Sequence, residues 1–274
     1  MTEKQYRRQW LRQHSQYEKI AYKELSKGFK ELGNSIPFTN MTADNYELIL
    51  EGSFNNESFF NIYYEMYNEI GIIHGKRVGR SINKQIKEFT FGSFLSVFEK
   101  ELLNWLFENL ADRVVTVRQS YLEYINKLIA NGLQEGKSIS KIATELTKKV
   151  NQRGFYRWQS LRIARTESTA AANYASSKAG SVSGILLEKV WISAADARTR
   201  RPPESEFNHL AMNGKRVGEK DYFNVPFRGG FEKLLFPADP KHGSAGNVIN
   251  CRCNAALVAK RDKDGRIMRV GDNN

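Results

Sequence analysis

The chain has 274 residues, of which 41% are hydrophobic and 26% are charged, proportions typical of a globular protein that can bury a sizeable core. No run approaches the roughly 18 apolar residues that a transmembrane helix needs, and the N-terminus lacks the apolar stretch of a secretory signal, so we expect neither a membrane partner nor secretion. The formal net charge is +12, and almost all of the excess lies after residue 137, which favours contact with a polyanion.

The first half of the chain carries the pattern of amphipathic helices. Apolar residues recur at three- and four-residue steps with charged residues between them, which predicts an all-helical N-terminal region of about four to six helices. We expect separate helices before and after Asp112, because an aspartate can cap the second one. His74 is expected to be a packing residue, since no second metal-binding side chain stands three or four positions away. The expected helices span 3–32, 46–50, 57–87, 91–111 and 112–131.

After residue 131 the pattern changes to shorter elements and long irregular loops. A helix is expected to start at Ser138 or Ser140, either of which can cap it. Alanine and other small residues predict a further helix over 156–180. Short apolar, β-branched runs predict strands over 184–193 and 250–259.

These elements predict an α+β protein in which an all-helical N-terminal region precedes a small mixed α/β, loop-rich C-terminal domain. The expected division places the helical region at 1–131 and the C-terminal domain at 132–259. Residues 260–274 are polar and charged, and we expect them to form a mobile tail.

Both cysteines of the chain lie in the segment NCRC, where Cys251 and Cys253 are predicted to share one face of a strand. Two cysteines so close in sequence have poor geometry for a disulfide, so reduced thiols are expected. Together with Asp196 and His209 they supply the residue types that bind zinc tetrahedrally. In the alternative interpretation the cysteines pack as small hydrophobic residues, His209 donates to a carbonyl, and Asp196 starts a turn into Arg198.

Five segments of the second half, taken in order, resemble the phage Mu protein F-like family of minor head (head morphogenesis) proteins over about residues 132–258. The segments are GKSISKIATEL, IARTESTAAANYA, KVWISAADARTR, NHLAMNG and NCRC. The resemblance implies characteristic residues at Arg165, Thr166, Glu167, Trp191, Asp196, Arg198, Thr199, His209, Gly214, Cys251 and Cys253.

The resemblance also implies a function without catalysis. Family members are virion components that act in head assembly, associate with the portal protein at one capsid vertex, and in some phages affect the DNA during ejection. The implied partners are the portal protein and major capsid or scaffold proteins. The implied location is the virion, after assembly in the host cytoplasm.

The residue types themselves are also compatible with two other functions. A metal-assisted hydrolase or nuclease would use Glu167 as a base together with His209 and Asp196. In the structural alternative, Glu167 pairs with Arg198 or Arg200 and fixes its helix against the loop. A nucleic-acid-binding effector would contact double-stranded DNA through exposed basic side chains. The candidates for DNA contact are Arg198, Arg200, Arg201, Lys215 and Arg216.

Overall fold

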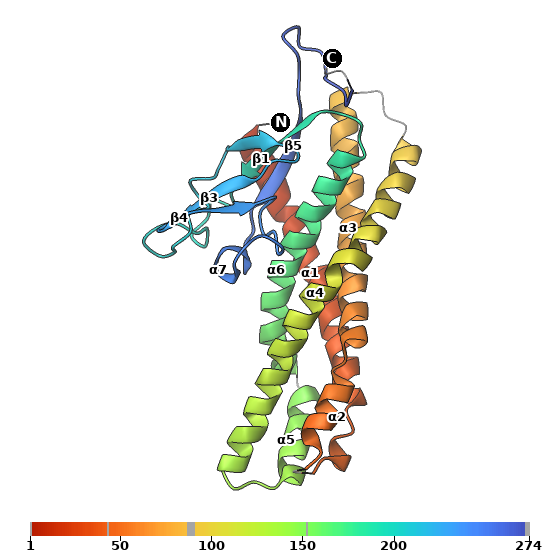
Figure 1. Cartoon of the computed structure of the whole chain (residues 1–274), viewed down its shortest axis with the longest axis vertical. Helices are drawn as coiled ribbons and strands as arrows, with labels where there is room; N and C mark the ends of the chain where they lie inside the picture. Colours follow the sequence, from red (N-terminus) through yellow and green to blue (C-terminus); the bar gives the residue numbers. More distant parts are fainter. Residues whose placement is uncertain (1, 43, 87–90, 152, 272–274) are drawn as a thin grey trace. The chain divides into compact units, whose positions relative to one another are not determined.

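The computed structural model describes residues 2–42, 44–86, 91–151 and 153–271 of the chain (Figure 1). It is 61% helical, and its strands all belong to the C-terminal region, which confirms the α+β class. None of the described helices is long and apolar enough to cross a membrane. The elements in chain order are α1 Glu3–Ser35, the 3-10 turn η1 Phe38–Asn40, α2 Tyr46–Ser53, α3 Asn56–Ile86, α4 Phe91–Gln134, α5 Ile139–Asn151, α6 Arg153–Ser181, β1 Leu187–Ile192, β2 Arg216–Gly218, β3 Phe223–Phe227, β4 Gly230–Leu234, α7 Ala245–Val248 and β5 Asn254–Ala259.

The chain forms two compact units, and each is assembled from segments far apart in sequence. Unit 1 comprises Met1–Ala21, Tyr67–Asn104 and Arg162–Asn274, and unit 2 comprises Tyr22–Met66 and Trp105–Leu161. The long helices α1, α3, α4 and α6 therefore each contribute residues to both units. The domain boundary expected after residue 131 stays a prediction.

Unit 2 is organised around an aromatic core. The rings of Phe29 and Tyr121 lie 4.6 Å apart between centroids, and Phe59 lies 5.6 Å from Tyr121. All three side chains are buried, so each removes a large apolar surface from water. Helix α5 starts where the sequence predicts, because the Ser138 hydroxyl accepts a hydrogen bond from the backbone N–H of Lys141.

Helix α4 is one continuous helix, so the expectation of two helices meeting at Asp112 is wrong. No proline interrupts the segment, and Asp112 lies inside the helix, where its carbonyl accepts from the hydroxyl of Thr116. An aspartate caps a helix only where the backbone leaves the helical conformation. A capping residue type alone was therefore not enough to end this helix.

In unit 1, helices α3 and α4 pack closely because α3 presents glycines at four-residue intervals. A Cβ added to Gly75 would lie 2.0 Å from the ring of Phe98, and one added to Gly79 would lie 2.3 Å from the ring of Phe94. A Cβ added to Gly71 would likewise lie too close to the side chain of Leu102. The aromatic rings of α4 therefore rest almost on the backbone of α3.

The strands of unit 1 form two small antiparallel sheets. Strand β1 is central in the order β2-β1-β5, with Trp191 opposite Ala255, and β3 and β4 form a separate hairpin. The two predicted strands are found as β1 and β5. Strand β5 begins at Asn254, however, so Cys251 and Cys253 lie in the preceding loop, and their placement on a strand is wrong.

The expected mobile tail is wrong for residues 260–271. The chain turns back after Asp262, whose carboxylate accepts from the backbone N–H of Arg266. The returning segment then pairs with the chain before β1, with Leu186 donating to the carbonyl of Met268. A polar composition therefore did not prevent order, because backbone hydrogen bonds hold the segment. Residues 272–274 lie outside the described residues.

We predict that Gly75→Ala destabilises the protein although alanine favours a helix by about 1 kcal/mol. The added methyl group collides with the Phe98 ring, and such overpacking costs about 1–3 kcal/mol. Gly52→Ala in helix α2 is the matched control, because a Cβ there meets nothing within 4 Å. Urea unfolding should show a lower midpoint for Gly75→Ala and an unchanged or higher one for Gly52→Ala; a rise in both would contradict the close packing of α3 on α4.

Candidate functional site

Three side chains of types that can bind metal ions converge in unit 1. The Nδ1 atom of His209 lies 3.6 Å from the Sγ of Cys251 and 3.7 Å from the Sγ of Cys253. The three ligand atoms all lie within 4.8 Å of one another, and all three residues are buried. His209 comes from the loop between β1 and β2, and the cysteines from the loop between α7 and β5. Two loops that are distant in sequence therefore meet at this His209–Cys251–Cys253 cluster.

The far side of the imidazole is held by a polar chain that sets its tautomer. The Nε2 of His209 lies 2.5 Å from the Oδ1 of Asn247, whose amide nitrogen donates to Glu232. Because Asn247 presents its oxygen to the ring, Nε2 carries the proton and Nδ1 is left with a lone pair toward the sulfurs. Trp191 packs edge-on against the ring at 5.4 Å. The ring is thus fixed in position and in tautomer.

Helix α6 fixes the cysteine loop through polar side chains on one face. The hydroxyl of Thr169 donates to the carbonyl of Cys251 at 2.6 Å, and the amide of Asn173 donates to the carbonyl of Cys253 at 3.1 Å. One turn earlier, Thr166 accepts from the backbone N–H of Asn250. These residues share a face because they are spaced by three and four positions. Sequence reasoning missed Thr169, Asn173 and Asn247; the helical spacing of the first two was the available signal.

The two thiols are coupled to each other. The hydrogen bond between the sulfurs, together with burial, raises the pKa of Cys253, and the same bond lowers the pKa of Cys251. Both cysteines are free thiols. Cys251 is accordingly the sulfur that loses its proton more readily.

Asp196 does not join this cluster; among the described His, Cys and acidic residues, the group of three contains neither Asp196 nor Glu167. The Asp196 carboxylate accepts from the guanidinium of Arg252 at 2.5 Å and from the backbone N–H of Arg198 at 3.0 Å. Burial opposes ionisation, but the hydrogen bond from Arg252 prevails and lowers the pKa of Asp196. Asp196 thus forms the turn into Arg198 that was one of the two sequence interpretations.

Glu167 is also engaged inside the protein. It is buried on helix α6, and its Oε2 accepts a hydrogen bond from the hydroxyl of Tyr67 at 2.6 Å. Its neighbour Arg165 lies on a more exposed face, 3.9 Å from Glu18.

Gly214 adopts a positive φ of 78°, which suits glycine, and its N–H donates to the carbonyl of Trp191. These family-motif residues therefore make specific contacts within unit 1.

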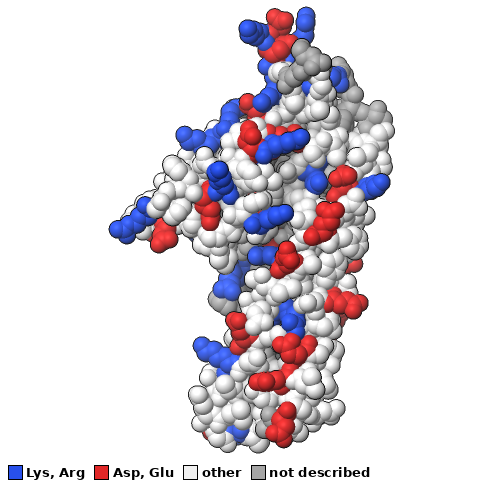
Figure 2. Space-filling view, in the orientation of Figure 1, with Lys and Arg blue, Asp and Glu red and all other residues white. Residues whose placement is uncertain are grey.

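The five basic candidates for DNA contact differ in their exposure and in their contacts. Arg198, Arg201 and Lys215 are exposed. Arg216 is exposed but lies 3.2 Å from Glu188, and half-buried Arg200 donates to the carbonyl of Ile249. Figure 2 shows Lys and Arg side chains interspersed with Asp and Glu on the face in view. Three of the five candidates are thus the best placed for a polyanion.

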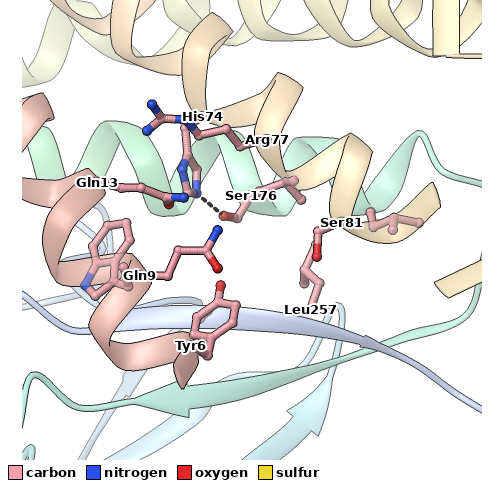
Figure 3. Close-up of a pocket in the computed structure, with 12 residues that line it drawn as sticks. Tyr6, Gln9, Gln13, His74, Arg77, Ser81, Ser176 and Leu257 are labelled. Atoms are coloured by element: carbon pink, nitrogen blue, oxygen red, sulfur yellow. Dashed lines mark hydrogen bonds between the residues drawn. The ribbon is translucent and has the colours of Figure 1, made fainter. Parts of the chain in front are cut away.

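A small cavity of about 60 Å³ in unit 1 is lined by residues that include the buried His74 (Figure 3). A second buried histidine, His14, packs against Trp10, which also lines the cavity. The Nε2 of His74 lies 2.8 Å from the hydroxyl of Ser176, and its Nδ1 lies 3.0 Å from the hydroxyl of Tyr17. The Nε2 of His14 lies 2.7 Å from the hydroxyl of Thr169. His74 is therefore a packing residue, as predicted, and its polar atoms are satisfied.

We predict that these histidines make stability depend on pH. Burial lowers the pKa of His14 and of His74 from 6.5 to about 3, with the charge of Arg252 adding to the effect on His14 and that of Arg77 on His74. Their contribution is complete above pH 6.5 and declines as the pH falls toward 3, by up to about 1.4 kcal/mol per pH unit for each histidine.

Urea unfolding between pH 7.5 and pH 5 measures this dependence. The midpoint of the unaltered protein should fall over that range, and the double variant His14→Gln, His74→Gln should show a shallower fall. A midpoint that stays constant between pH 7.5 and pH 5 in the unaltered protein would contradict neutral burial of the two rings.

A protein family matches part of the chain. The family described as "Phage Mu protein F like protein" matches residues 123–256, close to the range expected from the five sequence segments. No curated protein and no solved structure matches the chain. The matched range contains the whole of helix α6, the His209–Cys251–Cys253 cluster and the first half of strand β5. Residues 123–256, slightly less than half of the chain, thus match the phage Mu protein F-like family.

Proposed function

We propose that this phage head morphogenesis protein is a minor head component that docks at the portal vertex during assembly. The family match supports a role in the head and a location in the virion. The observation that carries the proposal is that the side chains capable of acid–base or metal chemistry make contacts inside the protein. Glu167, His209 and both cysteines are at most 2% exposed, and their polar atoms contact other parts of unit 1. Such residues stabilise the domain, and we assign its docking function to its surface.

The hydrolase or nuclease alternative is less well supported. Its candidate base Glu167 is held by Tyr67, and its candidate metal ligand Asp196 is held by Arg252. A general base must reach the proton that it removes. We therefore favour assembly over catalysis.

For docking, we propose the hairpin formed by β3 and β4. Phe231 lies at the start of β4 and is 68% exposed, whereas most large aromatic side chains of unit 1 are buried. Arg228 and Gly229 lie in the adjoining turn. An exposed aromatic side chain next to an arginine is the composition that interface hot spots favour. Phe231 also lies inside the family-matched range.

We predict that Phe231→Ser weakens association with isolated portal rings of the same phage about tenfold, because loss of one aromatic anchor costs roughly 1–2 kcal/mol. The control is Phe107→Ser, which removes a side chain of similar exposure, 63%, outside the matched range. Sedimentation with portal rings and with assembled heads measures both variants. Absence of binding by the unaltered protein would reject portal docking, and equal loss in both variants would reject the hairpin as the contact.

We further propose that Arg198, Arg201 and Lys215 contact packaged DNA, since all three are exposed. Such contacts release counterions from the phosphate backbone, so affinity falls as salt rises. Alanine at all three positions should reduce the slope of log affinity against log salt by about 2.7, or about 0.9 per contact.

The matched control replaces three exposed lysines outside the matched range or at its edge, Lys27, Lys30 and Lys127, and removes the same charge. Fluorescence anisotropy with a short duplex at several salt concentrations gives the slopes. Equal slopes for the two triple variants would show that net charge alone attracts DNA, and no binding at low salt would reject the contact.

A further inference from the structure

We propose that His209, Cys251 and Cys253 bind a zinc ion through three protein ligands, with water in the fourth position and without Asp196. The three side chains converge although two loops from different parts of unit 1 supply them. Thiolate and imidazole groups are ligands that zinc prefers over magnesium or calcium. The ion would join the loop after β1 to the loop before β5.

The distances in the cluster suit a metal. In tetrahedral coordination, with Zn–S near 2.3 Å and Zn–N near 2.05 Å, a sulfur and a nitrogen ligand lie about 3.6 Å apart. The observed distances from His209 Nδ1 to the two sulfurs are 3.6 and 3.7 Å. The lone pair of Nδ1 can accept a proton from only one thiol at a time, whereas one ion would satisfy all three atoms.

The surroundings of His209 match those of a metal-binding histidine. Such a histidine usually donates its second ring N–H to a carbonyl or carboxylate group, which fixes the ring and its tautomer. Here Nε2 donates to the side-chain carbonyl of Asn247, and Asn247 in turn donates to Glu232. The free Nδ1 faces the sulfurs, as a zinc ligand must.

The cysteine loop is held in place independently of any ion. Thr169 and Asn173 of helix α6 bind the carbonyls of Cys251 and Cys253. Asn250, just before Cys251, has a positive φ of 59° and is held by Thr166. A loop fixed in this way presents both sulfurs on the same side and reduces the entropy that binding must overcome.

The first test is the metal content of the untagged, reduced protein, measured by mass spectrometry after dialysis against metal-free buffer. We expect about one zinc per chain. Replacement of zinc by Co²⁺ should produce the near-ultraviolet thiolate charge-transfer absorption and the visible bands of a tetrahedral site. A folded protein that carries no zinc and develops no such absorption with Co²⁺ would overturn the proposal.

Variants then identify the ligands. Cys253→Ser and His209→Gln should each weaken zinc binding by at least about a hundredfold, and Asn247→Ala, which only positions His209, by about ten- to a hundredfold. Asp196→Asn is the matched control and should keep full zinc content and an unchanged Co²⁺ spectrum. Loss of zinc in Asp196→Asn would reject the three-ligand assignment.

Circular dichroism separates loss of a ligand from loss of the fold. If the cysteine variants do not fold, the Co²⁺ spectrum of the unaltered protein still decides the question, because thiolate absorption reports sulfur coordination directly. These measurements do not involve portal rings or DNA, so their outcome is separate from that of the docking experiments.

Discussion

The contact between helix α6 and the loop before β5 is the constraint on which unit 1 depends. This loop has no strand partner of its own, so its backbone carbonyls need donors from elsewhere. Thr169 and Asn173 supply them by donating to the carbonyls of Cys251 and Cys253. Asn173 also accepts from the backbone N–H of Ala255 in strand β5. The helix therefore determines both where the loop lies and where the strand begins.

The first turns of α1 also contact the loop before β5 and helix α6. The indole N–H of Trp10 donates to the carbonyl of Arg252, and the Nε2 of His14 lies 2.7 Å from the hydroxyl of Thr169. Tyr6 meets the side chain of Asn254 in β5. The N-terminal segment is thus part of the domain that the C-terminal segment forms. A buried polar arrangement of this kind specifies one packing, because an unpaired buried group costs about 1–3 kcal/mol.

In this arrangement, four residues whose types suggest acid–base or metal chemistry are buried rather than open to solvent, namely Glu167, His209, Cys251 and Cys253. The acid Glu167 and the imidazole of His209 lie inside unit 1 and serve to hold its elements together. Exposed side chains include the basic residues Arg198, Arg201 and Lys215 and the aromatic residue Phe231 of the β3–β4 hairpin. A rigid interior beneath a surface that contacts other proteins would suit the docking role proposed above.

The sequence by itself determined the features that depend on neighbouring residues. Helical periodicity predicted most helices, Ser138 predicted the start of α5, and β-branched runs predicted β1 and β5, because local propensity and capping act over a few residues. The motifs also predicted the family. Because histidine and cysteine are common metal ligands, the sequence predicted metal binding by His209 and the two cysteines. It did not predict how the three side chains are arranged in space.

Only the tertiary structure decided the features that depend on distant partners. Asp196 binds Arg252 rather than joining the cysteines, and Asn247 fixes the ring of His209. The polar segment after Lys260 is ordered by pairing with the chain before β1. In each case the energy comes from hydrogen bonds and ion pairs between residues far apart in sequence, and these form only when the chain folds.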